Sequence, residues 1–308
     1  MVLGMTLKAI GTLALMTSIL PLSAIAGPAI NQFEVKDLQS SPGEFEFQSQ
    51  NAYATGQPRR KTDGTNYDDN TFIRQREALE VQVGITDYFR VRVGIEFEQE
   101  ILDDPVSYSQ ANRFADLELD ELALEGVVVF IKPKKEGIGL GLLIEYGLPV
   151  SGGSESQSEL YIGPIIEAHT GAWTLIANLA FVQFIGGGGG DAVKDEKLDF
   201  SYFLQGKYDF SESFGLALEA YGTIDRLGNS GRRSEESEIF GDFNQHRAGP
   251  VAYYTFFPQR SHTTTSQLTT QSDDDAKELS VSVGVGALFG LNENTPDATY
   301  KFSLEVEY

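Results

Sequence analysis

The chain of 308 residues contains no cysteine. It can therefore form neither a disulfide framework nor a lipoprotein anchor, which needs a lipid-modified cysteine. After its first residues the chain also lacks an apolar run long enough for a transmembrane helix, which takes about 20 mostly apolar residues. A mature membrane protein with this sequence would have to be a β-barrel, because helices and closed barrels are the structures that satisfy every backbone group in lipid.

Basic residues are scarce, with 23 Lys and Arg against 45 Asp and Glu and a formal net charge of -22. A chain this acidic repels nucleic acid and anionic surfaces, so we expect no nucleic-acid partner. We assign most of the acids to solvated loop surface. The acidic runs Asp68-Asp69 and Asp273-Asp274-Asp275 lack the spaced ligands and the central glycine of a calcium loop. We therefore expect no cofactor and no metal.

The first 26 residues have the pattern of a secretory signal peptide. Lys8 is the one charge, an apolar run extends from Ala9 to Leu22, and Ala24-Ile25-Ala26 offers a small-residue cleavage site before Gly27. A membrane-anchoring helix is the alternative, but Gly, Thr, Ser and Pro interrupt the run. We predict a cleaved signal peptide over residues 1–26, a periplasmic N-terminal segment over residues 27–42, and an outer-membrane β-barrel over residues 43–308.

Apolar and polar residues alternate along most of the mature chain. In the last nine residues, Tyr300, Phe302, Leu304, Val306 and Tyr308 alternate with Lys301, Ser303, Glu305 and Glu307. Strand side chains alternate faces with period two, and in outer-membrane barrels the apolar face meets lipid while the polar face lines the lumen. The pattern predicts an all-β fold, a transmembrane antiparallel β-barrel with twelve strands, an even number as bacterial barrels require. The predicted strands cover residues 44–53, 79–85, 90–98, 117–130, 138–148, 160–167, 173–181, 198–207, 214–221, 247–257, 279–289 and 300–308.

Three places in this pattern are irregular. The alternation changes phase near Asp120-Glu121, which predicts a β-bulge. A hairpin loop with an odd number of residues, such as Asp87 to Phe89, keeps the apolar residues of both strands on one face. This loop would set Val83 opposite Val93 and Glu80 opposite Glu96. The segment Pro258 to Ala276 is long and polar, although it falls on the side of the short periplasmic turns. It is either a disordered periplasmic loop or a sign that a strand has been missed or invented.

The polar face of the predicted strands would line the lumen. Twelve strands enclose more room than eight and less than sixteen, so a pore would be narrow. The inward charges form either a structural network that stiffens the barrel or the lining that selects ions. The candidate lumen residues are Arg74, Arg76, Glu80, Arg92, Glu96, Glu98, Glu145, Glu167, Asn178, Lys207 and Glu219.

Several short motifs resemble one family. They are Gly147-Leu148-Pro149, Gly163-Pro164, Gly249-Pro250, and Phe289-Gly290-Leu291 continuing through Thr295-Pro296-Asp297. Over most of residues 75–308 the chain is similar to outer-membrane proteins grouped as the phenol-degradation meta-pathway or "transporter" family. The resemblance implies a barrel associated with uptake of small, often aromatic, compounds. It assigns no binding residues.

We therefore predict a channel or transporter-like barrel for small solutes, including small aromatic or other hydrophobic compounds, in the outer membrane of a Gram-negative bacterium. A sealed structural or surface-recognition barrel acting through its outer loops is the alternative. Ser230 and Ser234 faintly suggest a lipolytic enzyme, but no histidine lies just upstream to take a serine proton, so we predict no enzymatic activity. Expected partners are outer-membrane lipid and lipopolysaccharide, the barrel-assembly machinery through the C-terminal strand ending in Tyr308, and an unidentified small solute.

The selectivity interpretation predicts an electrical effect of neutralising one inward carboxylate. Glu80→Gln or Glu96→Gln should shift the preference for cations over anions, because a fixed negative charge leaves the pore lining. Reversal potentials in planar bilayers under a salt gradient measure this preference. Unchanged conductance and reversal potential would assign these carboxylates to a structural network.

Overall fold

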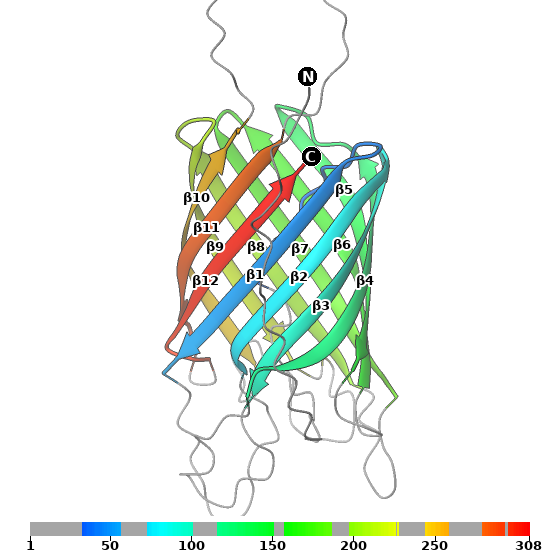
Figure 1. The fold of residues 1–308 in the computed structure, drawn as a ribbon, viewed down its shortest axis with the longest axis vertical. Helices are drawn as coiled ribbons and strands as arrows, with labels where there is room; N and C mark the ends of the chain where they lie inside the picture. Colours follow the sequence, from blue (N-terminus) through cyan, green and yellow to red (C-terminus); the bar gives the residue numbers. More distant parts are fainter. Residues whose placement is uncertain are drawn as a thin grey trace, which may run out of the picture.

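The computed structural model describes residues 33–56, 73–100, 116–150, 157–186, 197–225, 227, 244–258, 279–292 and 295–308. Within these ranges the chain forms twelve β-strands that pair antiparallel into one closed barrel (Figure 1), which confirms the predicted class and strand count. No helix among the described residues is long and apolar enough to cross a membrane. The strands are β1 (Phe45–Thr55), β2 (Ile73–Thr86), β3 (Phe89–Glu100), β4 (Glu118–Ile131), β5 (Gly137–Pro149), β6 (Gln157–Thr170), β7 (Trp173–Gly186), β8 (Leu198–Asp209), β9 (Phe214–Ile224), β10 (Gln245–Phe256), β11 (Ser280–Gly290) and β12 (Ala298–Glu307).

Some predicted features lie outside the described residues. These are the signal peptide over residues 1–26, the serines Ser230 and Ser234, and residues 259–276 of the long polar segment. Among the described residues, β10 pairs directly with β11 on either side of that segment, so both predicted strands belong to the barrel.

The terminal strand β12 closes the barrel by pairing with β1. Their Cα partners run from Glu46 and Glu307 to Thr55 and Ala298. Figure 1 shows the two strands, blue and red, side by side. Because each of the twelve described strands pairs with a neighbour on both sides, the sheet that they form has no free edge, as a lipid environment requires.

The two faces of the wall differ in the predicted way. On the outer face Leu218 is 64% exposed and Leu124 is 58% exposed. The next residues along the same strands, Glu219 and Glu125, point inward and are 0% and 3% exposed. A continuous apolar outer surface is unsuited to water and matches the lipid-facing band of a membrane barrel.

Aromatic side chains gather on the outer face at the end of the barrel that carries the short turns, called here the short-turn end. Trp173 and Tyr208 have ring centroids 5.0 Å apart, and Phe210 lies 4.9 Å from Tyr208 and 5.7 Å from Phe214. Such a belt suits the boundary between lipid and water. The aromatics predicted at this end, Tyr88, Phe89, Trp173, Phe214 and Tyr308, are all exposed.

The β2–β3 hairpin has a different register from the predicted one. Val83 lies opposite Val91 rather than Val93, because the turn contains two residues, Asp87-Tyr88, and the pairing shifts between Gly84 and Thr86. The bulge at that shift supplies the odd residue that keeps both apolar sets on one face. The predicted pair of Glu80 and Glu96 is therefore wrong; their β-partners here are Gly94 and Ala78.

The predicted bulge in β4 is confirmed. Glu96 pairs with Glu121 and the next residue, Phe97, pairs with Leu119, so Asp120 is left over between them. An extra residue of this kind bends a strand and lets its alternation change phase.

Two Gly-Pro steps interrupt the ladder at similar places. Pairing of β6 with β7 breaks at Gly163-Pro164, and pairing of β10 with β11 breaks at Gly249-Pro250. Proline has no N–H to donate. A Cβ at Gly163 would overlap the carbonyl oxygen of Leu179, and one at Gly249 would overlap that of Ala287. The adjacent strands therefore approach closely enough to require glycine.

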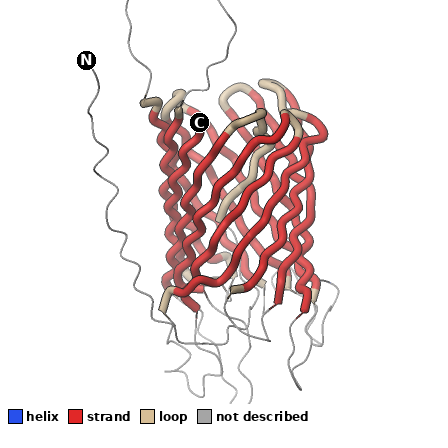
Figure 2. The backbone as a smooth tube through the Cα atoms, turned by 45° about the vertical axis from the view of Figure 1, so that its right-hand side comes forward, coloured by secondary structure: helices blue, strands red, loops and turns tan. Residues whose placement is uncertain are grey.

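Residues 33–42, called here the internal segment, run inside the barrel as a loop (Figure 2). Gly43, with φ of 73°, turns the chain into β1 in a conformation that glycine adopts readily. We expected residues 27–42 as a separate periplasmic segment. Their described part lies within the barrel instead, with Phe33, Lys36 and Leu38 exposed by 8%, 2% and 1%.

The close approach at the Gly-Pro steps predicts that added side chains there are costly. Gly163→Ala and Gly249→Ala should each lower the free energy of unfolding by about 1–3 kcal/mol, because a strand must shift to admit the methyl group. Denaturant unfolding in detergent micelles measures the change. Gly126→Ala is the control, since its nearest contact would be an ordinary 3.5 Å from Phe89. Equal stability of all three variants would contradict the prediction.

Candidate functional site in the barrel lumen

Side chains of the wall hold the main chain of the internal segment. Asn178 of β7 uses both ends of its amide: Oδ1 accepts the Lys36 N–H at 2.6 Å, and Nδ2 donates to the Lys36 carbonyl at 2.8 Å. Glu167 of β6 accepts the N–H of Leu38 at 2.7 Å. The wall strands pair with one another, so these side chains take the place of a strand partner for the segment.

Lys36 lies at the centre of a buried group of charges. Its Nζ is 2.6 Å from Glu34, 2.7 Å from Glu125 and 3.5 Å from Glu80. Arg92 of β3 is 2.6 Å from Glu34 and 3.0 Å from Glu80. Each cation thus faces several carboxylates, and removing one cation would leave buried negative charge without compensation.

The surrounding carboxylates favour the protonated, charged form of Lys36. Burial disfavours the charged ammonium, as does the nearby Arg92 guanidinium. The carboxylates of Glu125, Glu34 and Glu80 act in the other direction and raise the pKa of Lys36 above its ordinary value. The internal segment therefore carries a permanent positive charge into the lumen.

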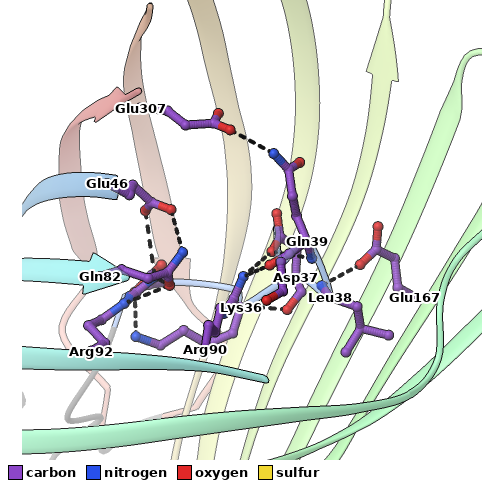
Figure 3. Close-up of polar contacts among 12 residues, drawn as sticks. Lys36, Asp37, Leu38, Gln39, Glu46, Gln82, Arg90, Arg92, Glu167 and Glu307 are labelled. Carbon is purple, nitrogen blue, oxygen red and sulfur yellow. Dashed lines mark hydrogen bonds and ion pairs between the residues drawn. The ribbon is translucent and has the colours of Figure 1, made fainter. Parts of the chain in front are cut away.

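Arg90 of β3 binds the segment nearer the short-turn end (Figure 3). Its Nη1 is 2.7 Å from the Asp37 carboxylate and donates to the Gln39 carbonyl at 2.6 Å. Its Nη2 donates to the Asp37 carbonyl at 2.9 Å. The Gln39 amide in turn donates to Glu307 of β12 at 2.8 Å. The segment is thus fixed to β3 and to β12, which are separated in the barrel by β1 and β2.

Leu38 fills an apolar recess in the wall. A Cβ at Gly139 of β5 would lie 2.9 Å from Leu38 Cδ1, and one at Gly141 would overlap its Cδ2. The two glycines therefore make room for this side chain. The other members of its apolar cluster are Val127, Val129, Leu143, Ile165 and Ile176.

Phe33 occupies an aromatic recess deeper in the lumen. Its ring meets Tyr221 edge-on at 5.7 Å, and the Arg247 guanidinium lies 5.1 Å from its centroid. The Tyr221 hydroxyl is 3.2 Å from the Phe33 carbonyl and 2.5 Å from Glu219, which also accepts from Lys301 at 2.8 Å. This recess combines the aromatic surface of Tyr221 with the ion pair between Glu219 and Lys301.

An unfilled pocket lies beside the described end of the internal segment. Its volume between Phe33-Glu34 and strands β1 to β3 is about 10 Å³, roughly the room that one water molecule needs. Gln50, Arg76, Glu80 and Glu96 give it polar walls, while Ala52 and Ala78 are small enough to leave the space open. The internal segment therefore narrows the lumen on this side without filling it.

Three carboxylates meet beside this pocket. Glu96, Glu121 and Glu145 each offer an oxygen, and these oxygens lie within 4.8 Å of one another. Such oxygens could ligate a hard cation. Arg76 already forms ion pairs with Glu96 and, at 3.4 Å, with Glu98. An acidic cluster with a resident arginine does not define a metal site, and we assign none.

The structure brings most of the predicted lumen residues together. Arg74 and Lys207 are half-buried, and Lys207 pairs with Asp209 at 3.3 Å. Their part in a pore stays a prediction. The predicted residues that lie buried are Arg76, Glu80, Arg92, Glu96, Glu98, Glu145, Glu167, Asn178 and Glu219.

Sequence reasoning missed the internal segment and its residues Glu34, Lys36 and Leu38. Its alternation of apolar and polar residues covers only Phe33 to Lys36, and its contacts are remote in sequence. One usable signal was charge, because the inward faces of β2 to β4 carry acids such as Glu80 and Glu125 near Arg92 and need a further cation.

A closed barrel with an apolar outer face and a charged interior has the architecture of outer-membrane channels. An outer-membrane channel from Pseudomonas putida F1 shares this fold, with 12% identity, a TM-score of 0.57, and alignment over 90% of this chain and 99% of that one. The NanC porin is 8% identical with a TM-score of 0.46, and the KdgM porin 7% identical with 0.42, each aligned over 85% of this chain and 98% of the porin. No protein-family model and no curated protein matches the sequence.

These comparisons support part of the sequence-based interpretation. The fold is that of an outer-membrane channel, whereas the resemblance to the phenol-degradation meta-pathway family remains a resemblance. The similar structure from Pseudomonas putida F1 is that of a channel. The expected contacts with lipopolysaccharide and with the barrel-assembly machinery stay predictions.

The buried charges predict that Lys36 holds the internal segment in place. Lys36→Met should release the segment, since removing one partner of a buried ion pair costs about 3–5 kcal/mol. The chain has no cysteine, so Val35→Cys supplies a unique thiol whose rate of labelling by a maleimide reports release. Labelling should accelerate by about tenfold or more. Lys132→Met is the control, because this exposed lysine pairs with Asp87 at 2.7 Å outside the lumen. Equal rates in both variants would contradict the prediction.

Proposed function

We propose that the chain is a channel for small solutes in the outer membrane of a Gram-negative bacterium. The charged side chains that face the partly filled lumen carry this proposal, because Arg76, Glu80 and Glu96 surround a small pocket beside Phe33 and Glu34 that the internal segment leaves unfilled. The fold shared with an outer-membrane channel supports the same function. A narrow, partly filled lumen favours small solutes over large ones.

Polar and charged side chains stand around the pocket and offer contacts to a small polar solute. Arg76, Glu80 and Glu96 place both signs of charge around it, and Gln50 adds an amide. Small aromatic or other hydrophobic compounds are the finer proposal, which comes from the family resemblance. The aromatic recess around Tyr221, which Phe33 occupies, would offer such compounds a surface once the Phe33 ring is displaced.

A sealed barrel that acts through its outer loops is the second candidate. The internal segment favours it, because Asn178, Glu167 and Arg90 tie the segment across the lumen. The two candidates differ in whether solutes pass the segment.

Conductance through single barrels in planar bilayers tests the proposal. The full chain should conduct weakly, and the double variant Lys36→Glu/Leu38→Asp should conduct more by a factor on the order of two to five. These substitutions place a negative charge against Glu80 and Glu125 and another in the apolar recess, without altering a strand. Lys132→Glu changes an exposed turn residue and serves as the control.

The first of two outcomes would contradict the proposal, and the second would correct the part that the internal segment plays in it. Absence of conductance in both the full chain and the double variant would favour the sealed barrel. Equal conductance of the two chains would show that the internal segment does not limit the path.

A further inference from the structure

The lumen recognises the internal segment largely through its main chain. Wall side chains bind six of its main-chain groups. Every peptide presents the same N–H and C=O groups, so this part of the recognition does not depend on the sequence of the occupant. The bound groups are the carbonyls of Phe33, Lys36, Asp37 and Gln39 and the N–H groups of Lys36 and Leu38.

The wall closes without the internal segment. Each strand pairs with its two neighbours, and β1 pairs with β12. Among the described residues, the first main-chain bond from this region to a strand comes after the segment, where Gly43 donates to the Gly84 carbonyl at 2.8 Å. The segment is therefore placed in the lumen as a tethered ligand would be.

Three recesses of the wall accept particular side chains of the segment. An aromatic ring at position 33 meets Tyr221 and Arg247. An aliphatic side chain at position 38 fills the space left by Gly139 and Gly141. A cation at position 36 meets carboxylates of two strands, Glu80 and Glu125.

We propose that the lumen is a binding site for short extended peptides, and that the internal segment occupies this site when no such peptide is present. The preferred peptide carries an aromatic residue, a basic residue three positions later and an aliphatic residue two positions after that. Main-chain bonds supply affinity and the three recesses supply preference. The inference rests on the proposed function, because a peptide reaches the site through the lumen, and it names one class of solute.

The test makes the internal segment exchangeable after the barrel has folded. A protease recognition sequence inserted between Pro42 and Gly43, which are both exposed, allows the folded full chain to be cut there in detergent micelles. A fluorescent peptide with the sequence Phe-Glu-Val-Lys-Asp-Leu-Gln-Ser should then bind saturably to the cut chain, and more weakly to the uncut chain, in which the tethered segment competes with it. Fluorescence anisotropy measures the binding.

Altered peptides separate main-chain recognition from side-chain recognition. Methylating the two backbone nitrogens that correspond to Lys36 and Leu38 removes the donors to Asn178 and Glu167 and should weaken binding by about tenfold or more. A peptide of reversed sequence should also bind less tightly, because its side chains miss the recesses.

A wall variant supplies the matched control on the barrel. Asn178→Ala should weaken binding of the peptide by about tenfold, since two main-chain bonds are lost. Asn292→Ala removes a comparable amide, which donates to the Asn244 carbonyl at the other end of the barrel, and should leave binding unchanged.

The double variant Lys36→Glu/Leu38→Asp provides a second receptor if cutting unfolds the barrel. The proposal would be overturned if the peptide bound neither the cut chain nor the double variant. It would also be overturned if the methylated peptide bound as tightly as the unmethylated peptide. Liposome swelling with arabinose on the same preparations reports the channel function separately. Swelling without peptide binding would contradict the peptide-binding site and leave the proposed channel standing. Peptide binding without swelling would support the peptide-binding site and contradict the proposed channel.

Discussion

The structure depends on one constraint: each backbone N–H and C=O in the wall must find its partner within the sheet, because lipid offers none. Pairing of β12 with β1 meets this constraint by removing the last free edges. Closure then assigns every side chain to one of two environments by its position in the strand. Leu218 reaches the outer surface and Glu219, one residue later, is buried inside.

The inward charges create the second requirement. Carboxylates such as Glu80 and Glu125 cannot stay charged in a confined interior without cations or water. Arg92 meets part of the need and Lys36, on a segment outside the wall, meets the rest. The lumen is consequently neither an empty pore nor a packed core. It holds an ordered piece of the chain beside a small unfilled pocket.

Local patterns account for the parts that sequence reasoning predicted well. The strand positions, the closed barrel and the bulge at Asp120 all follow from the period of two and from one change in its phase. The inward position of Glu219 and Asn178 follows from the same period. The register of β2 against β3 was wrong, because a bulge near Ile85 and a two-residue turn satisfy the same parity as the predicted three-residue loop.

By itself, the sequence determined which residues face lipid and which face the interior, since that choice depends on neighbours two positions away. The tertiary structure decided which inward groups meet. Lys36 and Asn178 are 142 positions apart, and their bonds exist because closure of the barrel carries β7 to the place where the internal segment passes. The same holds for the recesses around Phe33 and Leu38, whose walls come from strands distant in the chain. A local sequence period carries no information about contacts between residues so far apart in the chain. The contacts inside the lumen therefore follow only from the tertiary structure of the closed barrel.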